Sequence, residues 1–211
     1  MTEAEKDDRK VLERLMMFND AVYAIALTLL VLELKLPEGV SATDPNDMLH
    51  HLGSMTPRFL AFLLSVILVG SNWFSSINIQ RTMVRSNHLL IITMIIYLTI
   101  ISIMPFCCNI IGSYPDNPIS YVIFGVVSEL LLINAIFFLR NNRMNNLYHE
   151  GVDMNEISKL EKSLPFTAVF NICMIATAFY STKLTFILFL GYNLLPFFLS
   201  RSLRVNHKET M

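Results

Sequence analysis

Long apolar runs alternate with short polar blocks along the whole chain. Six runs stand out, at residues 15–36, 57–79, 88–111, 118–139, 164–181 and 184–200. A helix of about 20 apolar residues crosses the hydrocarbon core of a bilayer. The pattern therefore predicts an all-α, polytopic membrane protein with six transmembrane helices, organised as a single domain over residues 1–211.

The connectors between the runs predict two helical hairpins and an orientation. A tight link at residues 112–117 joins the third and fourth runs, and only Thr182 and Lys183 separate the fifth from the sixth. Lysine and arginine gather in the leader, in the second and fourth connectors and in the tail. The positive-inside rule then predicts a multi-pass protein with both termini in the cytoplasm.

Composition agrees with this interpretation and removes several function classes. Hydrophobic residues make up 54% of the chain, and the mean hydropathy of +0.51 exceeds the soluble norm. A net charge of -1 favours neither a nucleic-acid partner nor a polybasic lipid-binding patch. Cys107, Cys108 and Cys173 lie in predicted spans without metal-ligand spacing, so we expect packing roles and no metal site. The absence of protease and hydrolase motifs predicts no enzyme.

The first run carries a stripe of side chains on one helical face. A helix turns about 100° per residue, which aligns Ile25, Leu29 and Leu32 with the hydroxyl of Thr28. Rings of branched apolar side chains around a symmetry axis can gate ions by dewetting. Packing in any buried helix gives the same spacing, so periodicity alone leaves both interpretations open.

Ionisable residues inside spans are costly, so each one present predicts a role. Asp20 points away from the stripe, and we expect it to accept hydrogen bonds from neighbouring helices. Glu33 either concentrates cations at the outer mouth or is a helix-end carboxylate paired with Lys35 or water. Glu129 either hydrogen-bonds within the bundle, to Asn134 or a neighbouring helix, or is a proton-sensitive site.

Residues 14–28 carry a recognisable motif: Arg14, then Phe18, Asn19 and Asp20, in an otherwise apolar helix. This stretch resembles the first helix of the endosomal/lysosomal transmembrane potassium channel family, whose bacterial members carry Arg-x-x-x-Phe-Ser-Asp there. The similarity continues through Leu32, Glu33, Pro37, Trp73, Pro105 and Phe106. Two departures are clear: Asn19 replaces the serine of the motif, and Ser76 and Ile77 replace a histidine pair that often follows the tryptophan.

The resemblance implies a homotetramer of six-helix chains in a prokaryotic cell membrane, with the four first helices around a central pore. By position relative to the motif, Ile25 is expected to form the main constriction and Leu29 and Leu32 further apolar layers. Thr28 resembles the hydroxyl layer linked to cation preference. The motif residues Arg14, Phe18, Asn19 and Asp20 are expected to hold the cytoplasmic half of this helix.

The expected function is a leak-like, potassium-permeable channel, with monovalent cations as permeant species and no cofactor. The chain lacks a Thr-Val-Gly-Tyr-Gly loop, so selection is expected at side chains and not at a carbonyl filter. The alternative is a proton-coupled secondary transporter with Asp20 and Glu129 as protonation sites. Such folds usually have repeated halves and helices broken by Gly or Pro near the midplane. No clear repeat is found here, and Pro105 and Pro196 lie near predicted span ends.

Overall fold

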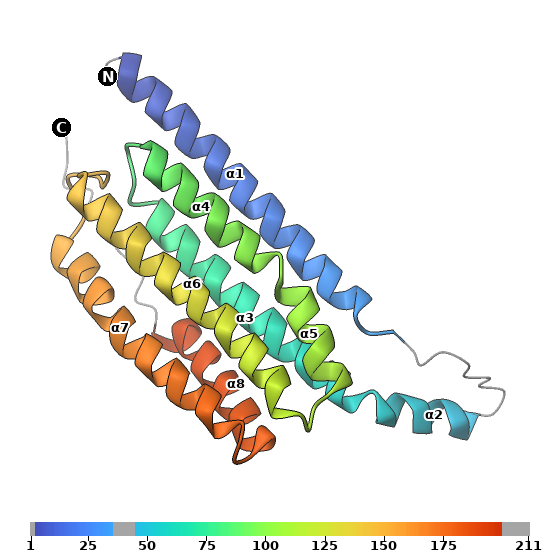
Figure 1. Ribbon diagram of the computed structural model, residues 1–211. Coiled ribbons are helices and arrows are strands. Elements are labelled where there is room, and N and C mark those ends of the chain that lie inside the picture. The colour runs from blue at the N-terminus through green and yellow to red at the C-terminus, as the bar shows by residue number, and fades with distance from the viewer. Residues whose placement is uncertain (1–2, 36–44, 200–211) are drawn as a thin grey trace.

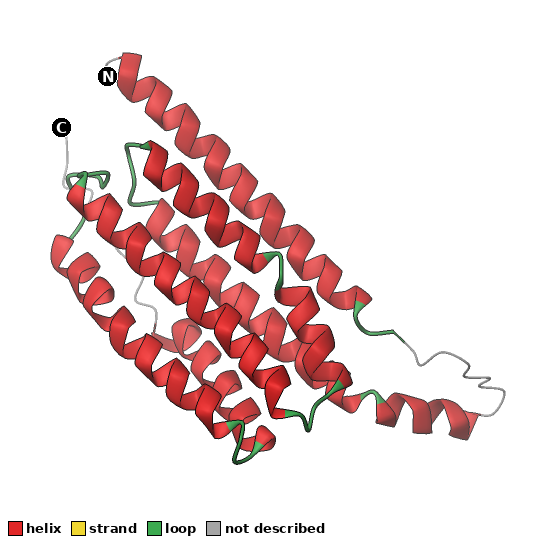
Figure 2. Ribbon diagram, in the orientation of Figure 1, coloured by secondary structure: helices red, strands yellow, loops and turns green. Residues whose placement is uncertain are grey.

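The computed structural model describes residues 3–35 and 45–199. These ranges form the following helices: α1 Glu3–Leu32, α2 Pro45–Ser54, α3 Thr56–Gln80, α4 His88–Ile101, α5 Met104–Ser113, α6 Pro118–Met144, α7 Met154–Thr177 and α8 Thr182–Leu199. Figure 2 shows that short loops join most of them. Leu36, Pro37 and Ser200, where sequence expectations were placed, lie outside the described residues.

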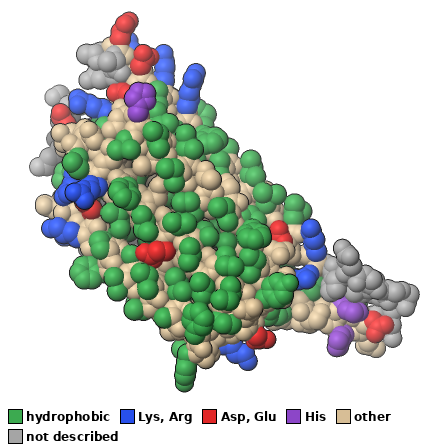
Figure 3. Space-filling model, viewed as in Figure 1, with side chains coloured by type: hydrophobic (Ala, Val, Ile, Leu, Met, Phe, Trp, Pro, Cys, Tyr) green, Lys and Arg blue, Asp and Glu red, His purple; other side chains and the backbone are tan. Residues whose placement is uncertain are grey.

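Four helical segments within these ranges are long and apolar enough to cross a membrane: Lys6–Leu32, Thr56–Gln80, His88–Ser113 and Pro118–Met144. They correspond to the first four predicted runs, so an all-helical chain with several candidate membrane spans is confirmed. The fifth and sixth runs lie in α7 and α8, and their crossing of the membrane stays a prediction. Figure 3 shows hydrophobic side chains over the middle of one face, with most Lys and Arg toward its ends.

The third span is interrupted where the sequence predicted a continuous helix. α4 ends at Ile101 and α5 begins at Met104, with Pro105 in the first turn of α5. Proline lacks an N–H and clashes with the carbonyl four residues earlier, although the first turn of a new helix tolerates it. Pro105 therefore marks a break inside the span, which corrects the expectation that it lies near a span end.

The helices pack as one bundle with α1 at its edge. α1 contacts α3, α4 and α5, while α7 and α8 pack together on the other side against α6 and α3 (Figure 1). α2 extends away from the bundle at the end where α3 begins. Fully buried side chains, including Tyr23, Leu64, Phe124 and Phe189, form the central core. The two predicted hairpins are present as α5–α6 and α7–α8.

α7 begins well before the apolar run that predicted it at residues 164–181. The carboxylate of Asp153 caps its first turn by accepting a hydrogen bond from the backbone N–H of Asn155, at 2.9 Å. Ile157 is fully buried in this polar extension. The guanidinium of Arg143 at the end of α6 pairs with the Glu161 carboxylate at 3.0 Å. A cap and local contacts thus extend the helix into a segment whose composition alone is typical of a loop.

Gly125 allows α6 and α7 to approach closely. A Cβ atom at this position would lie 2.2 Å from Cγ1 of Ile175. The β-branched Ile175 has few rotamers in a helix and cannot turn away freely. Gly125→Ala is therefore expected to destabilise the folded chain by about 1–3 kcal/mol, measured by thermal unfolding in detergent. Adding Ile175→Ala is expected to recover stability, and a double variant no more stable than Gly125→Ala would contradict this packing.

Candidate functional site

α1 has one face buried against its own chain and another that is exposed. The buried side chains recur at helical spacing, at Leu12, Asn19, Tyr23, Ala26 and Leu30. Because these positions share one side of a helix, the rotation of α1 about its axis is fixed by the contacts they make. The side chains on the opposite side stay exposed within the described residues.

The stripe predicted from the sequence lies on the exposed face. Ile25 is 58% exposed, Leu29 42% and Leu32 61%, and Thr28 is also exposed. The Thr28 hydroxyl donates to the backbone carbonyl of Ile25 at 2.8 Å. Its proton is therefore engaged within the helix, and the oxygen lone pairs remain available on the exposed face.

Two hydrogen bonds from the motif residues tie α1 to α3. The Asn19 side-chain amide donates to the Ser76 hydroxyl at 3.3 Å, and the indole N–H of Trp73 donates to the Asp20 carboxylate at 2.9 Å. Ser76 is one of the two residues that replace the family's histidine pair, and Asn19 replaces the motif serine. The two departures from the family pattern therefore meet in one contact.

A third tie, which sequence reasoning missed, runs through two tyrosines. The hydroxyl of Tyr23 donates to that of Tyr97 on α4 at 3.1 Å. The Tyr97 hydroxyl in turn donates to the amide oxygen of Asn72 on α3 at 2.8 Å. The signal in the sequence was the position of Tyr23, four residues after Asn19 and hence on the same helical face. Its partners come from distant segments and leave no local pattern.

The two charged residues toward the ends of α1 differ in their surroundings. Arg14 is exposed and makes no hydrogen bond or ion pair within residues 3–35 and 45–199. The Glu33 carboxylate accepts a hydrogen bond from the Asn109 amide of α5. The Arg58 guanidinium donates to the carbonyl oxygen of Lys35 at 2.7 Å, which ties the segment after α1 to α3. The described partner of Glu33 is thus Asn109 and not Lys35.

Glu129 lies away from α1, at the contact between α6 and α7. Its carboxylate accepts a hydrogen bond from the Asn171 amide at 2.8 Å, and the same amide donates to the Gly125 carbonyl at 3.2 Å. Of the partners considered from the sequence, the structure therefore shows a neighbouring helix. Asn134 is not bonded to Glu129, and its amide oxygen has no partner in the described ranges.

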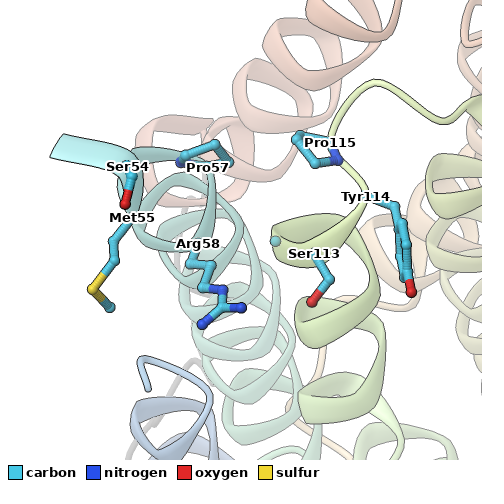
Figure 4. A pocket seen from close by; sticks show the side chains of 8 residues that line it. Ser54, Met55, Pro57, Arg58, Ser113, Tyr114 and Pro115 are labelled. Atoms are coloured by element: carbon cyan, nitrogen blue, oxygen red, sulfur yellow. The ribbon is translucent and has the colours of Figure 1, made fainter. Parts of the chain in front are cut away.

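Two cavities lie away from the exposed face of α1, and neither was predicted from the sequence. A cavity of about 530 Å³ lies between the α2–α3 junction and the connector after α5, with Arg58 as its charged lining residue (Figure 4). A larger one, of about 730 Å³, lies inside the bundle between α3, α6, α7 and α8. Within the described residues, no three His, Cys, Asp or Glu side chains are placed to hold a metal ion.

Comparison with known proteins gives several related potassium channels. One from Chryseobacterium sp. strain P1-3 is 30% identical over 79% of this chain and 82% of its own length. One from Chamaesiphon minutus is 27% identical over 82% of this chain and 86% of its own. A third, from Streptomyces collinus, is 27% identical over 57% of this chain and 58% of its own.

The fold of the chain and the sequence of its first part indicate the same relationship. The crystal structure of a lysosomal potassium-selective channel TMEM175 homolog from Chamaesiphon minutus matches with a TM-score of 0.71 and 26% identity, covering 89% of this chain and 98% of that one. The family model for the endosomal/lysosomal potassium channel TMEM175 matches residues 14–105, which include the α1 motif and the helices that hold it. This chain belongs to the TMEM175 family.

Proposed function

We propose that this protein is a potassium-permeable, leak-like channel formed by four copies of the chain, with α1 of each copy lining the pore. The names of the three relatives as potassium channels and the match to a solved potassium-selective homolog support permeation of potassium. The proposal includes six membrane crossings per chain, counting α7 and α8, in a single domain of the cell membrane with both termini in the cytoplasm.

The observation that carries this proposal is the rotation of α1. Asn19, Asp20 and Tyr23 are hydrogen-bonded to α3 and α4. Ile25, Thr28 and Leu32 consequently lie on the face turned away from the rest of the chain. Other helices also expose apolar side chains, as a bilayer requires. The exposed face of α4 carries a similar combination, with the Thr99 hydroxyl donating to the Ile95 carbonyl. The choice of α1 therefore rests on its motif, which resembles the first helix of the family and lies within the segment that the family model matches.

Four Ile25 side chains around an axis would form the main constriction, with Leu29 and Leu32 as further apolar layers. Such a ring dewets when narrow and conducts when the helices rotate or move apart and water fills it. An ion passing the ring loses part of its hydration shell. This loss costs less for potassium than for the more strongly hydrated sodium, so the constriction favours potassium.

Thr28 would complement the constriction by offering oxygen ligands to the partly dehydrated ion. Its hydroxyl proton is directed to the Ile25 carbonyl, so a ring of four such oxygens would present acceptors toward the axis. Glu33 would raise the local cation concentration at the outer mouth while it accepts the Asn109 hydrogen bond. Arg14 and Phe18, which are both exposed, would contact neighbouring copies at the cytoplasmic end.

A proton-coupled transporter is not favoured. The relatives are named potassium channels, and Asp20, one of the two protonation sites that such a mechanism needs, accepts a hydrogen bond from Trp73 that suits a structural role. The other, Glu129, lies against Asn171 and away from the exposed face of α1. The break at Pro105 is a feature found in transporters, but it lies on a helix without an ionisable residue at the break.

The test is passive flux from the purified full chain in liposomes, with potassium or sodium gradients. Thr28→Val keeps the side-chain shape and removes the oxygen. We expect it to lower the potassium-to-sodium flux ratio by about threefold or more, since each 1.4 kcal/mol of lost ion stabilisation is about tenfold. Thr28→Ser keeps the oxygen and is expected to retain the ratio.

Two outcomes would contradict the proposal. One is a chain without uncoupled cation flux that takes up its substrate only under a proton gradient, which would indicate a transporter. The other is a flux ratio that is identical in the native chain, Thr28→Val and Thr28→Ser, which would remove Thr28 from the ion path. The thermal unfolding temperature of each variant in detergent controls for folding.

A further inference from the structure

The larger cavity lies within a single chain, and none of its lining residues belongs to the exposed face of α1. Its walls come from α3, α4, α6, α7 and α8, with Asn19 contributed by α1. Ligand pockets commonly have a volume of about 300–1,000 Å³, mostly apolar walls and a few placed polar groups. At about 730 Å³, with Leu68, Leu131 and Phe189 among its walls, this cavity fits that description.

Three buried amide oxygens in the lining have no hydrogen-bond partner among the residues that the structure describes. They belong to Asn19, Asn134 and Asn171, whose side chains are 0%, 8% and 1% exposed. A buried polar atom without a partner costs roughly 1–3 kcal/mol, so native proteins rarely leave several together. A molecule inside the cavity is placed to supply the partner that these oxygens lack among the described residues.

Several amide and hydroxyl donors of the same cavity are already used. The Asn72 and Asn193 amides donate to the carbonyls of Leu68 and Phe189 one turn earlier. The Asn171 amide donates to Gly125 and Glu129. The hydroxyl of Ser76 donates to the carbonyl of Trp73, so it receives the Asn19 donor and the orientation of that amide is fixed. The free capacity of the Asn19 and Asn171 amides is therefore for accepting hydrogen bonds, which suits a cation or a strong donor.

Charges near the cavity favour a cation over a neutral donor. The carboxylate of Glu129 accepts a hydrogen bond from the amide nitrogen of Asn171, whose amide oxygen is free. Lys159 and Glu156 in the lining pair with each other at 2.7 Å, and this hydrogen bond raises the pKa of Lys159. Because these two charges compensate each other, the remaining carboxylate beside the lining is that of Glu129, which does not itself line the cavity.

We propose that this cavity binds a small amphipathic organic cation of the primary-ammonium class. Its ammonium group donates to the amide oxygen of Asn134, and its apolar body lies along Leu131 and Phe138. These two residues are three positions before and four after Asn134, on the same face of α6, and both line the cavity. Asn134 is the anchor because its amide oxygen is buried and has no hydrogen-bond partner within the described residues. The site is separate from the proposed pore.

The test is binding of hexylammonium to the purified full chain in detergent, followed by calorimetry and by the shift in unfolding temperature. Saturable binding is expected for the native chain and much weaker binding for the neutral analogue 1-hexanol. Asn134→Leu removes the anchor and is expected to weaken hexylammonium binding about tenfold or more, since a hydrogen bond to a charged group is lost. Asn134→Asp keeps the shape, adds negative charge and is expected to strengthen it.

The controls separate a lost ligand contact from a lost fold. Asn134→Leu replaces an unpartnered buried amide by an apolar group of similar size, so the unliganded variant is expected to unfold at or above the native temperature. Val126→Leu, an exposed position on α6 outside the lining, is expected to leave binding unchanged. Equal hexylammonium affinity in Asn134→Leu and Val126→Leu would overturn the proposal. Equal response to 1-hexanol, or no saturable binding, would also do so and would leave water as the occupant.

Discussion

Replacing Ile25 by asparagine is expected to raise cation flux through the reconstituted protein by about tenfold or more and to reduce its preference for potassium over sodium. A polar side chain at the proposed constriction hydrates it, so ions pass without losing part of their water. Lowering the barrier by about 1.4 kcal/mol is sufficient for a tenfold change. Flux of both ions from liposomes, normalised to the amount of inserted protein, measures both effects.

Ile92→Asn is the matched control, because it makes the same change at an exposed position of α4, outside the stripe of α1. It is expected to leave the flux ratio unchanged. A ratio that shifts equally in both variants would indicate a general leak caused by asparagine in the bilayer. A flux unaffected by Ile25→Asn would remove Ile25 from the constriction, although the family assignment would stand.

The positions of most helices follow from local properties of the sequence. The first four predicted runs match the four candidate spans closely, since an uninterrupted apolar stretch of this length in a helix satisfies both its backbone and the bilayer. The residues of the predicted stripe, Ile25, Leu29 and Leu32, lie on one face of α1 because helical geometry alone aligns them. Which face of α1 points away from the chain was not determined by periodicity.

Contacts between distant helices could not be predicted because they depend on packing in three dimensions. The tyrosine pair Tyr23 and Tyr97 joins residues 74 positions apart, and neither has a distinctive local pattern. The free oxygens of the inner cavity likewise become visible only once six helices surround them. The early start of α7 was missed because its polar extension gains its stability from a cap and a buried Ile157 and not from composition.

Asn19 and Ser76, the two residues at which this chain departs from the pattern expected by resemblance, contact each other. The Asn19 amide donates to the Ser76 hydroxyl. The bond between them, at 3.3 Å, keeps α1 tied to α3 at this level. This contact therefore helps to fix the orientation of one turn of α1 in this chain. The neighbouring contact between Asp20 and Trp73 matches the family motif at both residues and makes the stronger test of this orientation.

Removing the contact between Asp20 and Trp73 is expected to loosen the rotation of α1. Trp73→Phe deletes the N–H donor, and Asp20→Leu deletes the acceptor and its charge. A double-mutant cycle is expected to give a coupling energy of about 1 kcal/mol or more in thermal unfolding. Each single variant already loses the hydrogen bond to the charged carboxylate, so the double variant loses nothing further from that bond. Both single variants and the double variant are expected to lower the potassium-to-sodium flux ratio to the same extent.

The equal loss is the informative part of this prediction. If the contact acts by orienting Ile25 and Thr28, breaking it from either side has one consequence for the pore, and breaking it twice adds nothing. Val31→Ala, at an exposed position of α1 outside the stripe, is the control and is expected to keep the flux ratio. Additive losses of stability and of selectivity in the double variant would mean that Asp20 and Trp73 act separately, and that the orientation of α1 depends on Asn19 and Tyr23 without them.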